Sequence, residues 1–435
     1  MPGMTSPSTA LLTDHYELTM VQAALATGHA HRSCVFEAFA RRLPEGRRYG
    51  VVAGTGRMLE ALADFRFGAA EIDFLADNHV VNEQTLDFLS DYRFTGDIWG
   101  YAEGECYFPG SPVLVVESTF AEGVILETLI LSMLNHDSAV ASAASRMTAA
   151  AGDRPCIEMG SRRTHEESAI AAARAAYIAG FTATSNLEAG RRHGVPTMGT
   201  AAHSFTLLYG SERSAFAAQL DSLGTGTSLL VDTYDITAGV ELAVELAGSR
   251  IGGVRLDSGD LISGARDVRE HLDSLGATDT AIVVTSDLDE YAIAALQAAP
   301  VDSYGVGTKV VTGSGAPAAG MVYKLVSRAD DSGEMESVAK VSKDKRSVGG
   351  RKYALRRRNS TGVAQEEIVG IGAAPTDDGD DRDLFVRLVL DGQVVAATDA
   401  DSARARHAAS RDELPTRAMQ LSHGDPAIDT TYLTA

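Results

Sequence analysis

The stretch SLLVDTYDITAGVELAVELAGSRIGGVRLDSGD, residues 228–260, decides the fold because it holds one full repeat of a pattern that fills the middle of the chain. A short apolar run leads into a polar cluster and a helix-like segment, and a second apolar run and polar cluster follow. Apolar runs that alternate with helical segments at this spacing are typical of parallel βα units. Each run therefore predicts a buried strand, and each polar cluster predicts a loop at the carboxyl end of that strand.

The pattern extends from this stretch in both directions. Its apolar runs occupy residues 156–157, 181–184, 195–199, 228–231, 253–256, 281–285 and 303–306. The clearest helix-like segment is 165–179, which Thr164 and Glu167 introduce with the spacing of a capping box. Seven runs, each followed by a polar cluster, favour a closed or nearly closed βα barrel, since barrel enzymes assemble their sites from the loops at the strands' carboxyl ends. An open doubly wound sheet is the alternative.

The regions on either side of the repeats have a different pattern. Residues up to about 120 combine helix-like pieces with strand-like segments, and the strand-like stretches after residue 323 are separated by acidic or glycine-rich loops at 329–336 and 376–383. We expect an α+β unit at the start of the chain, which the last region rejoins. The alanine-rich stretch 138–151 predicts a helix rather than a linker.

The composition is that of a globular chain with no general affinity for polyanions. Its 435 residues are 45% hydrophobic and 22% charged, which is enough chain for two cores. The net charge of −21 argues against generic binding to nucleic acid or to an anionic membrane. With no secretory signal pattern and no apolar run of about 20 residues, we expect no membrane span. Cys34, Cys106 and Cys156 are scattered and lack metal-ligand spacing, so we expect no disulfide framework, no dedicated metal site, and a cytoplasmic location.

The polar clusters carry the candidate chemistry. They lie at residues 160–163, 184–186, 199–203, 232–235, 255–260, 286–287 and 305–308. Together they supply arginines, carboxylates, one histidine and two glycine-bearing turns. Arginine binds phosphate oxygens bidentately, and glycine turns expose backbone N–H groups to a phosphate where a helix begins. The clusters therefore predict a sugar-phosphate ligand.

Each cluster also has a purely structural interpretation. The turn at 305–308 can close a strand–helix corner, and the arginine pair at 162–163 can be a solvated helix start, although two cations there oppose the helix dipole and favour a bound anion. His203 can be a structural histidine, and Asp232 and Asp257 can cap the helices after their strands. The occurrence of Arg, His and Asp at the ends of successive strands favours a functional site.

Eight motifs identify the family that the chain resembles. They are TDHYELTM (13–20), EMGSRRTHE (158–166), TATSN (182–186), GTAAHSF (199–205), LLVDTYD (229–235), RLDSGDL (255–261), TSDLDEYAI (285–293) and YGVGTKVVTG (304–313). In this order they are similar to the motifs of nicotinate phosphoribosyltransferases, and GTAAHSF, VDTYD and RLDSGDL are the most specific. The resemblance implies an enzyme that forms nicotinate mononucleotide and pyrophosphate from nicotinate and phosphoribosyl pyrophosphate, with ATP hydrolysis assisting, in NAD biosynthesis or salvage.

The resemblance also implies a fold and an assembly. The family has an irregular βα barrel, expected here at 126–326, and an α+β sandwich domain that 1–125 forms and 327–435 completes. Members are typically homodimers with shared active sites, so Tyr16 is expected to stack on the nicotinate ring of the neighbouring subunit. The alternative is that Tyr16 packs against its own helix. The small-molecule partners would be nicotinate, phosphoribosyl pyrophosphate and ATP, with Mg²⁺ bound through substrate phosphates.

Individual roles follow from the same resemblance. His203 matches the histidine that ATP phosphorylates, and Asp232 matches the residue that orients it. Asp257 matches a carboxylate for the ribose diol or for substrate-bound magnesium, with Asp260 assisting. Three arginines are candidates for the phosphates or the nicotinate carboxylate, and the 286–287 and 305–308 turns are the expected cradle of the 5′-phosphate. The remaining expected contacts are Met159, Arg162, Arg163, Thr184, Ser185, Arg255, Ser258, Gly259, Ser286, Asp287, Gly305, Gly307 and Thr308.

Base choice is expected to depend on Ser185. Nicotinamide-using relatives carry an aspartate at the matching position, which would repel a carboxylate, so serine favours nicotinate. Two features depart from the family pattern: Met159 replaces a common phenylalanine, and residues 340–358 resemble the family's basic loop without its usual proline–glycine turn. The close alternative is use of nicotinamide or quinolinate. Alternatives from other classes are a barrel isomerase or aldolase for sugar phosphates that uses Lys309 or a carboxylate, and a non-enzymatic phosphate-ligand sensor.

Overall fold

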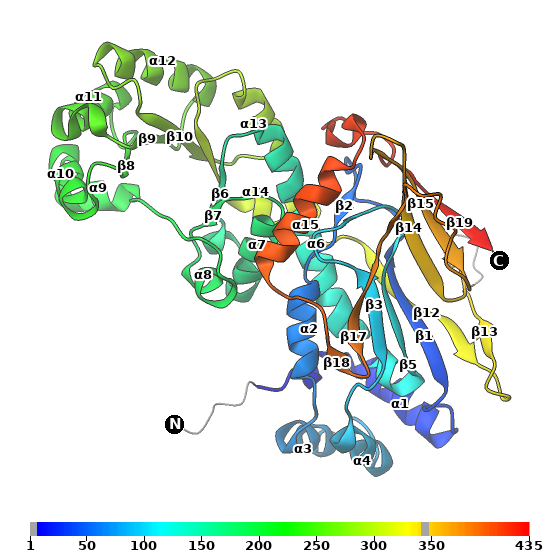
Figure 1. Ribbon diagram of the computed structural model, residues 1–435. Coiled ribbons are helices and arrows are strands. Elements are labelled where there is room, and N and C mark those ends of the chain that lie inside the picture. The colour runs from blue at the N-terminus through cyan, green and yellow to red at the C-terminus, as the bar shows by residue number, and fades with distance from the viewer. Residues whose placement is uncertain (1–6, 341–347, 435) are drawn as a thin grey trace. The chain divides into compact units, whose positions relative to one another are not determined.

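A computed structural model describes residues 7–340 and 348–434, so the part of the basic loop at 341–347 lies outside the described residues. The chain forms two compact units (Figure 1). The terminal unit comprises Met1–Ala139 and Ala318–Ala435, and the central unit comprises Val140–Pro317, where the sequence placed the divisions near 125 and 326. Helix α6 (Glu127–Ala151) continues from the first into the second and contains the alanine-rich stretch, whose predicted helix is confirmed.

Six parallel strands form the sheet of the central unit. They are β6 (Cys156–Glu158), β7 (Ala183–Thr184), β8 (Ser228–Leu230), β9 (Gly253–Leu256), β10 (Ala281–Ser286) and β11 (Ser303–Val306). Their order is β7–β6–β11–β10–β9–β8, and every ladder between neighbours is parallel. A parallel bridge from Thr184 to Thr197 continues the sheet at the run predicted for 195–199. Each predicted run therefore has a place in the sheet, and the α/β class is confirmed.

The strand order in this unit is cyclic. The first and last strands, β6 and β11, pair with each other, so the series β8 to β11 continues directly into β6 and β7. Within residues 140–317, all of which are described, no ladder joins the Thr197 bridge to β8. Because all the strands run in the same direction, the polar clusters that follow them lie along one edge of the sheet.

Helices and short 3-10 turns connect the strands. They are η2 (Ser161–Arg163), α7 (Glu166–Ile178), α8 (Leu187–His193), α9 (His203–Tyr209), α10 (Glu212–Leu223), α11 (Ile236–Ala247), η3 (Gly248–Arg250), α12 (Leu261–Ser274), α13 (Glu290–Leu296), α14 (Thr308–Val311) and η4 (Gly313–Gly315).

The start of α7 corrects the predicted capping box. Thr164 has extended backbone and ends the η2 turn, so it is not the helix cap. His165 is the N-cap instead, and its Nδ1 accepts the N–H of Glu167 at 3.3 Å. The predicted Thr164–Glu167 box is wrong because Thr164 is the C-cap of the arginine turn, so the cap of the next helix falls one residue later.

Strands from both ends of the chain build the terminal unit. Its largest sheet has the order β13–β12–β1–β5–β3–β17–β18, and two smaller sheets have the orders β16–β14–β15–β19 and β2–β4. Strand β1 (Ser33–Ala40) lies between β12 and β5, and every residue after Ser33 is buried. The C-terminal segment therefore completes the sheet that the N-terminal segment begins.

The other elements of this unit fall into two series. The N-terminal series is η1 (Ala10–Leu12), α1 (His15–Ala26), β2 (Gly50–Val51), α2 (Thr55–Ala63), α3 (Ala69–Asp77), α4 (Glu83–Asp91), β3 (Asp97–Tyr101), β4 (Cys106–Tyr107), β5 (Pro112–Thr119) and α5 (Phe120–Val124). The C-terminal series is β12 (Met321–Ala329), β13 (Met335–Ser337), β14 (Lys352–Arg358), β15 (Ala364–Ile371), β16 (Arg382–Asp383), β17 (Phe385–Leu390), β18 (Gln393–Val394), α15 (Ala400–Asp412), η5 (Thr416–Met419) and β19 (Asp429–Thr434).

Among the described residues, one helical stretch, Phe120–Ala151, has the length and apolar composition of a membrane span. Of its most apolar window, 61% is buried inside the structure. Ile130, Leu134 and Val140 are each at most 1% exposed. Burial in a protein core accounts for the composition of this stretch.

The three cysteines are buried free thiols. Burial raises the pKa of Cys34 to about 11 and those of Cys106 and Cys156 to about 12. The thiolate is the nucleophilic and metal-binding form, so at neutral pH these side chains act as packing groups.

Candidate active site

The loops after β8 and β9 place two aspartates side by side. Leu230 pairs with Arg255 in the parallel ladder, so Asp232 and Asp257, which follow these strands, lie at the same edge. Asp232 Oδ2 accepts the backbone N–H of Asp257 and the hydroxyl of Ser258, both at 2.8 Å. The two loops are therefore joined through one carboxylate.

His203 faces this carboxylate from the start of α9. Its Nε2 lies 3.8 Å from Asp232 Oδ1, and its Nδ1 lies 3.2 Å from the hydroxyl oxygen of Thr233. The Asp232 side chain is 1% exposed, and the His203 side chain is 41% exposed. Oδ1 of Asp232 is buried and has no hydrogen-bond partner among the described residues, so the imidazole is the polar group it faces.

Asp232 and Asp257 do not cap the helices that follow their loops, α11 and α12. Asp235 caps α11 by accepting the N–H of Ala238 at 2.8 Å, and Asp260 caps α12 by accepting the N–H groups of Ile262 and Ser263. The alternative that Asp232 and Asp257 serve as helix caps is therefore wrong. Their carboxylates remain directed to the site.

Asp257 and Arg255 add opposite charges to the same edge. Asp257 Oδ1 accepts the hydroxyl hydrogen of Thr285. Arg255 donates to the Thr200 hydroxyl at 2.7 Å and to the Ala201 carbonyl at 2.8 Å. Burial lowers the pKa of Arg255, while Asp257 and Asp232 raise it, and the guanidinium stays charged at neutral pH.

The arginine turn after β6 supplies further positive charge. Arg162 and Arg163 form η2 with Ser161, and both are exposed, so they do not begin an α-helix. The charge of Arg162 also contributes to lowering the pKa of Arg255, which means that the two guanidiniums feel each other. A site with neighbouring cations suits a ligand that carries several negative charges.

The ends of β6, β7 and β11 carry four of the expected contacts: Met159, Thr184, Ser185 and Gly305. The N–H of Met159 donates to the Val306 carbonyl at 2.8 Å, and that of Ser185, which is exposed, donates to the Glu158 carbonyl at 2.8 Å. A Cβ on Gly305 would lie 2.4 Å from Cγ2 of Thr285 on the neighbouring strand and 2.8 Å from the sulfur of Met159. Close strand packing therefore requires glycine at 305, in addition to any contact with a phosphate.

The expected phosphate cradle combines an exposed turn at 286–287 with a buried to half-buried turn at 305–308. Ser286 has φ of 147°, a conformation that L-residues rarely adopt, and both it and Asp287 are exposed. Gly307 is the N-cap residue of α14, and Thr308 is its first residue. In the loop between Asp257 and α12, Gly259 has φ of +83°, which allows the tight turn there.

Tyr16 belongs to α1 of the terminal unit. Its side chain is 44% exposed and lies near the carboxylates of Glu127, Glu17 and Asp14. Burial and the neighbouring carboxylates raise the pKa of Tyr16 to about 12, so the phenol stays neutral. The stacking of Tyr16 on a base in a neighbouring subunit stays a prediction.

Three residues at the site lie within the quoted motifs but were given no role by the sequence analysis. Glu158 is fully buried at the end of β6, Thr285 holds Asp257, and Thr233 contacts His203. A carboxyl that interrupts an apolar run is the signal that could have identified Glu158. The two threonines carry no such signal, because threonine is common at strand ends.

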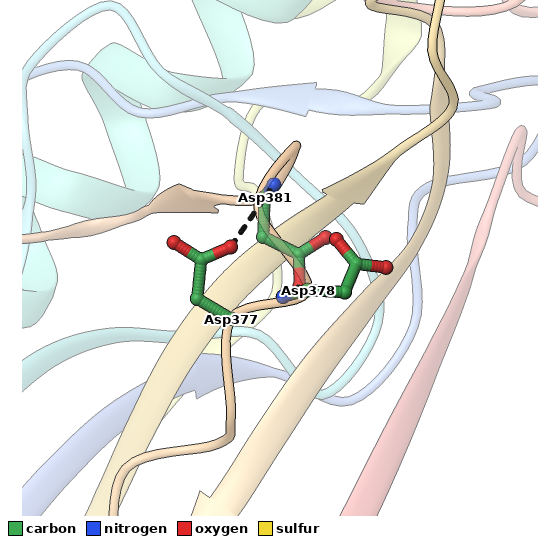
Figure 2. Close-up of side chains that lie close together, drawn as sticks. All are labelled: Asp377, Asp378 and Asp381. Atoms are coloured by element: carbon green, nitrogen blue, oxygen red, sulfur yellow. Dashed lines mark hydrogen bonds between the residues drawn. The ribbon is translucent and has the colours of Figure 1, made fainter.

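A cluster of three carboxylates lies in the terminal unit (Figure 2). Asp377, Asp378 and Asp381 have oxygens within 4.8 Å of one another. Asp377 accepts the N–H of Gly379 at 2.7 Å, and Arg357 pairs with Asp381 at 3.0 Å and with Asp378 at 3.4 Å. The turn and the arginine account for the cluster.

Comparison with known proteins connects this arrangement to one family. Residues 11–135 match the family model described as the nicotinate phosphoribosyltransferase N-terminal domain. A nicotinate phosphoribosyltransferase of Mycobacterium tuberculosis is 57% identical over 98% of this chain and 95% of its own length. The human nicotinate phosphoribosyltransferase is 30% identical over 86% of this chain and 81% of its own.

Solved structures agree in fold. The crystal structure of human nicotinic acid phosphoribosyltransferase superposes with a TM-score of 0.81 at 25% identity, over 95% of this chain and 96% of that one. Nicotinate-nucleotide pyrophosphorylase from Pyrococcus furiosus gives a TM-score of 0.76 at 22% identity, over 95% of this chain and 98% of its own. Nearly the whole chain thus shares the fold of these proteins.

Proposed function

The chain belongs to the nicotinate phosphoribosyltransferase family, and from this premise we propose that it couples ATP hydrolysis to phosphoribosyl transfer. The transfer itself is the activity of the family and of this chain: nicotinate and phosphoribosyl pyrophosphate give nicotinate mononucleotide and pyrophosphate, in NAD biosynthesis and salvage. The observation that carries the ATP proposal is the exposed imidazole of His203, which faces the buried, unpartnered Oδ1 of Asp232.

In the proposed phosphorylation, Asp232 holds the proton on Nε2 of His203, and Nδ1 attacks the γ-phosphorus of ATP. A nitrogen–phosphorus bond forms, the phosphorus–oxygen bond to ADP breaks, and ADP leaves with the bonding electrons. The ring becomes positively charged, and the carboxylate of Asp232 balances that charge. Attack by water then releases inorganic phosphate and restores the neutral imidazole.

In the proposed transfer, the pyridine nitrogen approaches C1 of the ribose as pyrophosphate departs. A carbon–nitrogen bond forms, a carbon–oxygen bond breaks, and the ribosyl centre passes through an oxocarbenium-like state. Arg255, Arg162 and Arg163 neutralise the phosphates and the nicotinate carboxylate, and the turns at 286–287 and 305–308 bind the 5′-phosphate. The enzyme's contribution is positioning and stabilisation of the leaving charge.

The carboxylates at this edge fit a magnesium ion that arrives with the substrate. Thr285 engages Oδ1 of Asp257, and Asp260, which is exposed, begins the next helix. Magnesium keeps several waters and binds through one or two carboxylates together with substrate phosphates, so it needs no cage made only of protein. When bound, it would neutralise charge on the pyrophosphate group.

We further propose an irregular barrel in the central unit, a homodimer with shared sites, and a cytoplasmic location. The cyclic strand order supports the barrel.

Exposed apolar side chains support the dimer: Leu207 and Leu208 on α9 are 61% and 79% exposed, and Tyr16 is 44% exposed. Sedimentation equilibrium measures the assembly state, and a monomeric active enzyme would contradict the dimer.

The deciding experiment replaces His203 with Ala. The purified variant is expected to incorporate no phosphate from γ-labelled ATP and to lose the ATP stimulation of nicotinate mononucleotide formation. The control is His271→Ala, since His271 lies near the far end of α12 and pairs with Glu241 at 3.4 Å. Phosphate incorporation at the wild-type level in the His203 variant would refute the phosphohistidine.

A further inference from the structure

Glu158 is a buried carboxyl that no step of the proposed reaction uses. Its side chain is 0% exposed, and it accepts hydrogen bonds from the hydroxyl of Thr184 and the N–H of Gly160, both uncharged donors. Burial raises the pKa of Glu158, and these two hydrogen bonds counteract the rise. Burying a carboxyl without a cation costs free energy, so a packing role alone does not account for it.

The carboxyl belongs to a closed ring of hydrogen bonds. The N–H of Asn186 donates to the hydroxyl oxygen of Thr184 at 3.0 Å, and the Asn186 side-chain amide donates to the hydroxyl oxygen of Ser161 at 3.0 Å. Ser161 directly follows Gly160, whose N–H closes the ring on Glu158. The ring therefore ties the loop after β6 to the loop after β7.

The residues expected to hold the base lie directly next to the members of this ring in the sequence. Ser185 lies between two ring members, and its own N–H donates to the Glu158 carbonyl. Arg162 and Arg163 complete the turn that the ring's serine opens. The fit around the carboxyl is tight, since a Cβ on Gly160 would lie 2.9 Å from Glu158 Oε1.

We propose that Glu158 is a positioning residue that sets base selectivity by holding the arginine turn and Ser185 at a fixed separation. This inference rests on the proposed function, because it assigns the base to the same site. A pyridine-3-carboxylate then meets two cations and a neutral serine at once, whereas a pyridine amide gains little from the cations. Misplacement of such groups by about 1 Å costs up to about 100-fold in rate.

The test uses Glu158→Gln and Thr184→Val in the full chain, with nicotinate and nicotinamide as competing bases. Both variants are expected to raise the KM for nicotinate about 10-fold or more and to reduce the preference for nicotinate over nicotinamide by a similar factor. Thr184→Ser retains the hydroxyl and should restore the preference.

A matched control separates positioning from general stability. Glu290 is a buried carboxyl of the same unit that accepts from Arg146 at 3.1 Å and from Ser314 at 2.6 Å. Glu290→Gln should lower the melting temperature without changing base preference. The proposal is overturned if Glu158→Gln keeps the wild-type KM for nicotinate. It is also overturned if the variant raises the KM values for nicotinate and nicotinamide by the same factor, as simple destabilisation would.

Calorimetric binding of nicotinate and nicotinamide distinguishes this inference from the proposed function. A wild-type chain that binds nicotinate selectively without turnover would contradict the function, and loss of that selectivity in the Glu158 variant would still support the positioning role.

Discussion

Asp232 divides its two carboxylate oxygens between two tasks. Oδ2 holds the loop of Asp257 and Ser258 through hydrogen bonds of 2.8 Å, and Oδ1 faces the imidazole of His203 at 3.8 Å. Since the side chain is almost fully buried, water does not satisfy Oδ1. A carboxylate arranged in this way orients the histidine and balances its charge.

Ser185 is the residue at which base choice can be changed directly. Ser185→Asp is expected to lower kcat/KM for nicotinate at least about tenfold, equivalent to about 1.4 kcal/mol, because the new carboxylate repels that of nicotinate. The kcat/KM for nicotinamide should rise, since the amide of nicotinamide donates a hydrogen bond to the new aspartate. A competition assay with both bases measures the change.

Ser185→Asn provides the control for this substitution. It has nearly the size of aspartate without the charge, so nicotinate should remain the preferred base. An aspartate variant that also keeps this preference would show that Ser185 does not contact the base.

At the scale of elements, the loops after β8 and β9 follow one design. Each contains two aspartates three positions apart, Asp232 with Asp235 and Asp257 with Asp260. The first of each pair faces the site, and the second caps the helix that follows. The cap fixes where the helix begins, and the helix start holds the loop that carries the first aspartate.

Removing either cap is expected to destabilise the protein modestly. Asp235→Ala and Asp260→Ala should each lower the free energy of unfolding by about 1 kcal/mol, because one backbone N–H group loses its acceptor in the first variant and two lose theirs in the second. Thermal unfolding followed by circular dichroism measures this loss.

Activity measurements are expected to distinguish the roles of the two capping aspartates. Asp235→Ala should leave kcat/KM unchanged. Asp260→Asn retains a capping side chain and removes the charge, so it should keep the stability and raise the KM for phosphoribosyl pyrophosphate. An unchanged KM for phosphoribosyl pyrophosphate would show that Asp260 acts only as a helix cap.

At the scale of the whole molecule, a buried ionic network joins the two ends of the chain. Arg356 of β14 donates to Glu105 at 2.8 Å and to Glu367 at 2.6 Å, and all three side chains are at most 2% exposed. Arg382 also donates to Glu105, at 2.9 Å, and to Glu413, at 2.7 Å. Strands and a helix from the C-terminal region are thereby held against an N-terminal loop.

Breaking this network should destabilise the protein strongly. Glu105→Gln is expected to lower the free energy of unfolding at pH 7 by about 1.5–3 kcal/mol, because Arg356 and Arg382 lose the charged acceptor that they share and keep only Glu367 and Glu413. Urea titration measures the difference. The control is Glu188→Gln, where the exposed pairs with Arg191 and Arg192 should contribute little.

The same variant gives a pH signature. The arginines lower the pKa of Glu105 to about 2 against the burial that raises it, so the folded chain binds this proton more weakly than the unfolded chain. The contribution of Glu105 is therefore complete above its ordinary pKa of 4.5 and is lost as the pH falls from there towards 2. The stability difference between wild type and Glu105→Gln should shrink over this range. Burial raises the pKa of Glu367, and the charge of Glu105 adds to the rise, so Glu367 works in the opposite direction and does so less strongly in the variant.

Local pattern was sufficient for the order of strands and loops, the α/β class and the family, because hydrophobic periodicity and motif spacing are properties of neighbouring residues. It also placed His203, Asp232, Asp257 and Arg255 at strand ends. The tertiary structure decided which aspartate of each pair faces the site and which one caps a helix. It also decided that Glu158 closes a ring of hydrogen bonds. These outcomes depend on strand register and on contacts between residues far apart in the chain, such as Thr285 with Asp257, about which periodicity carries no information.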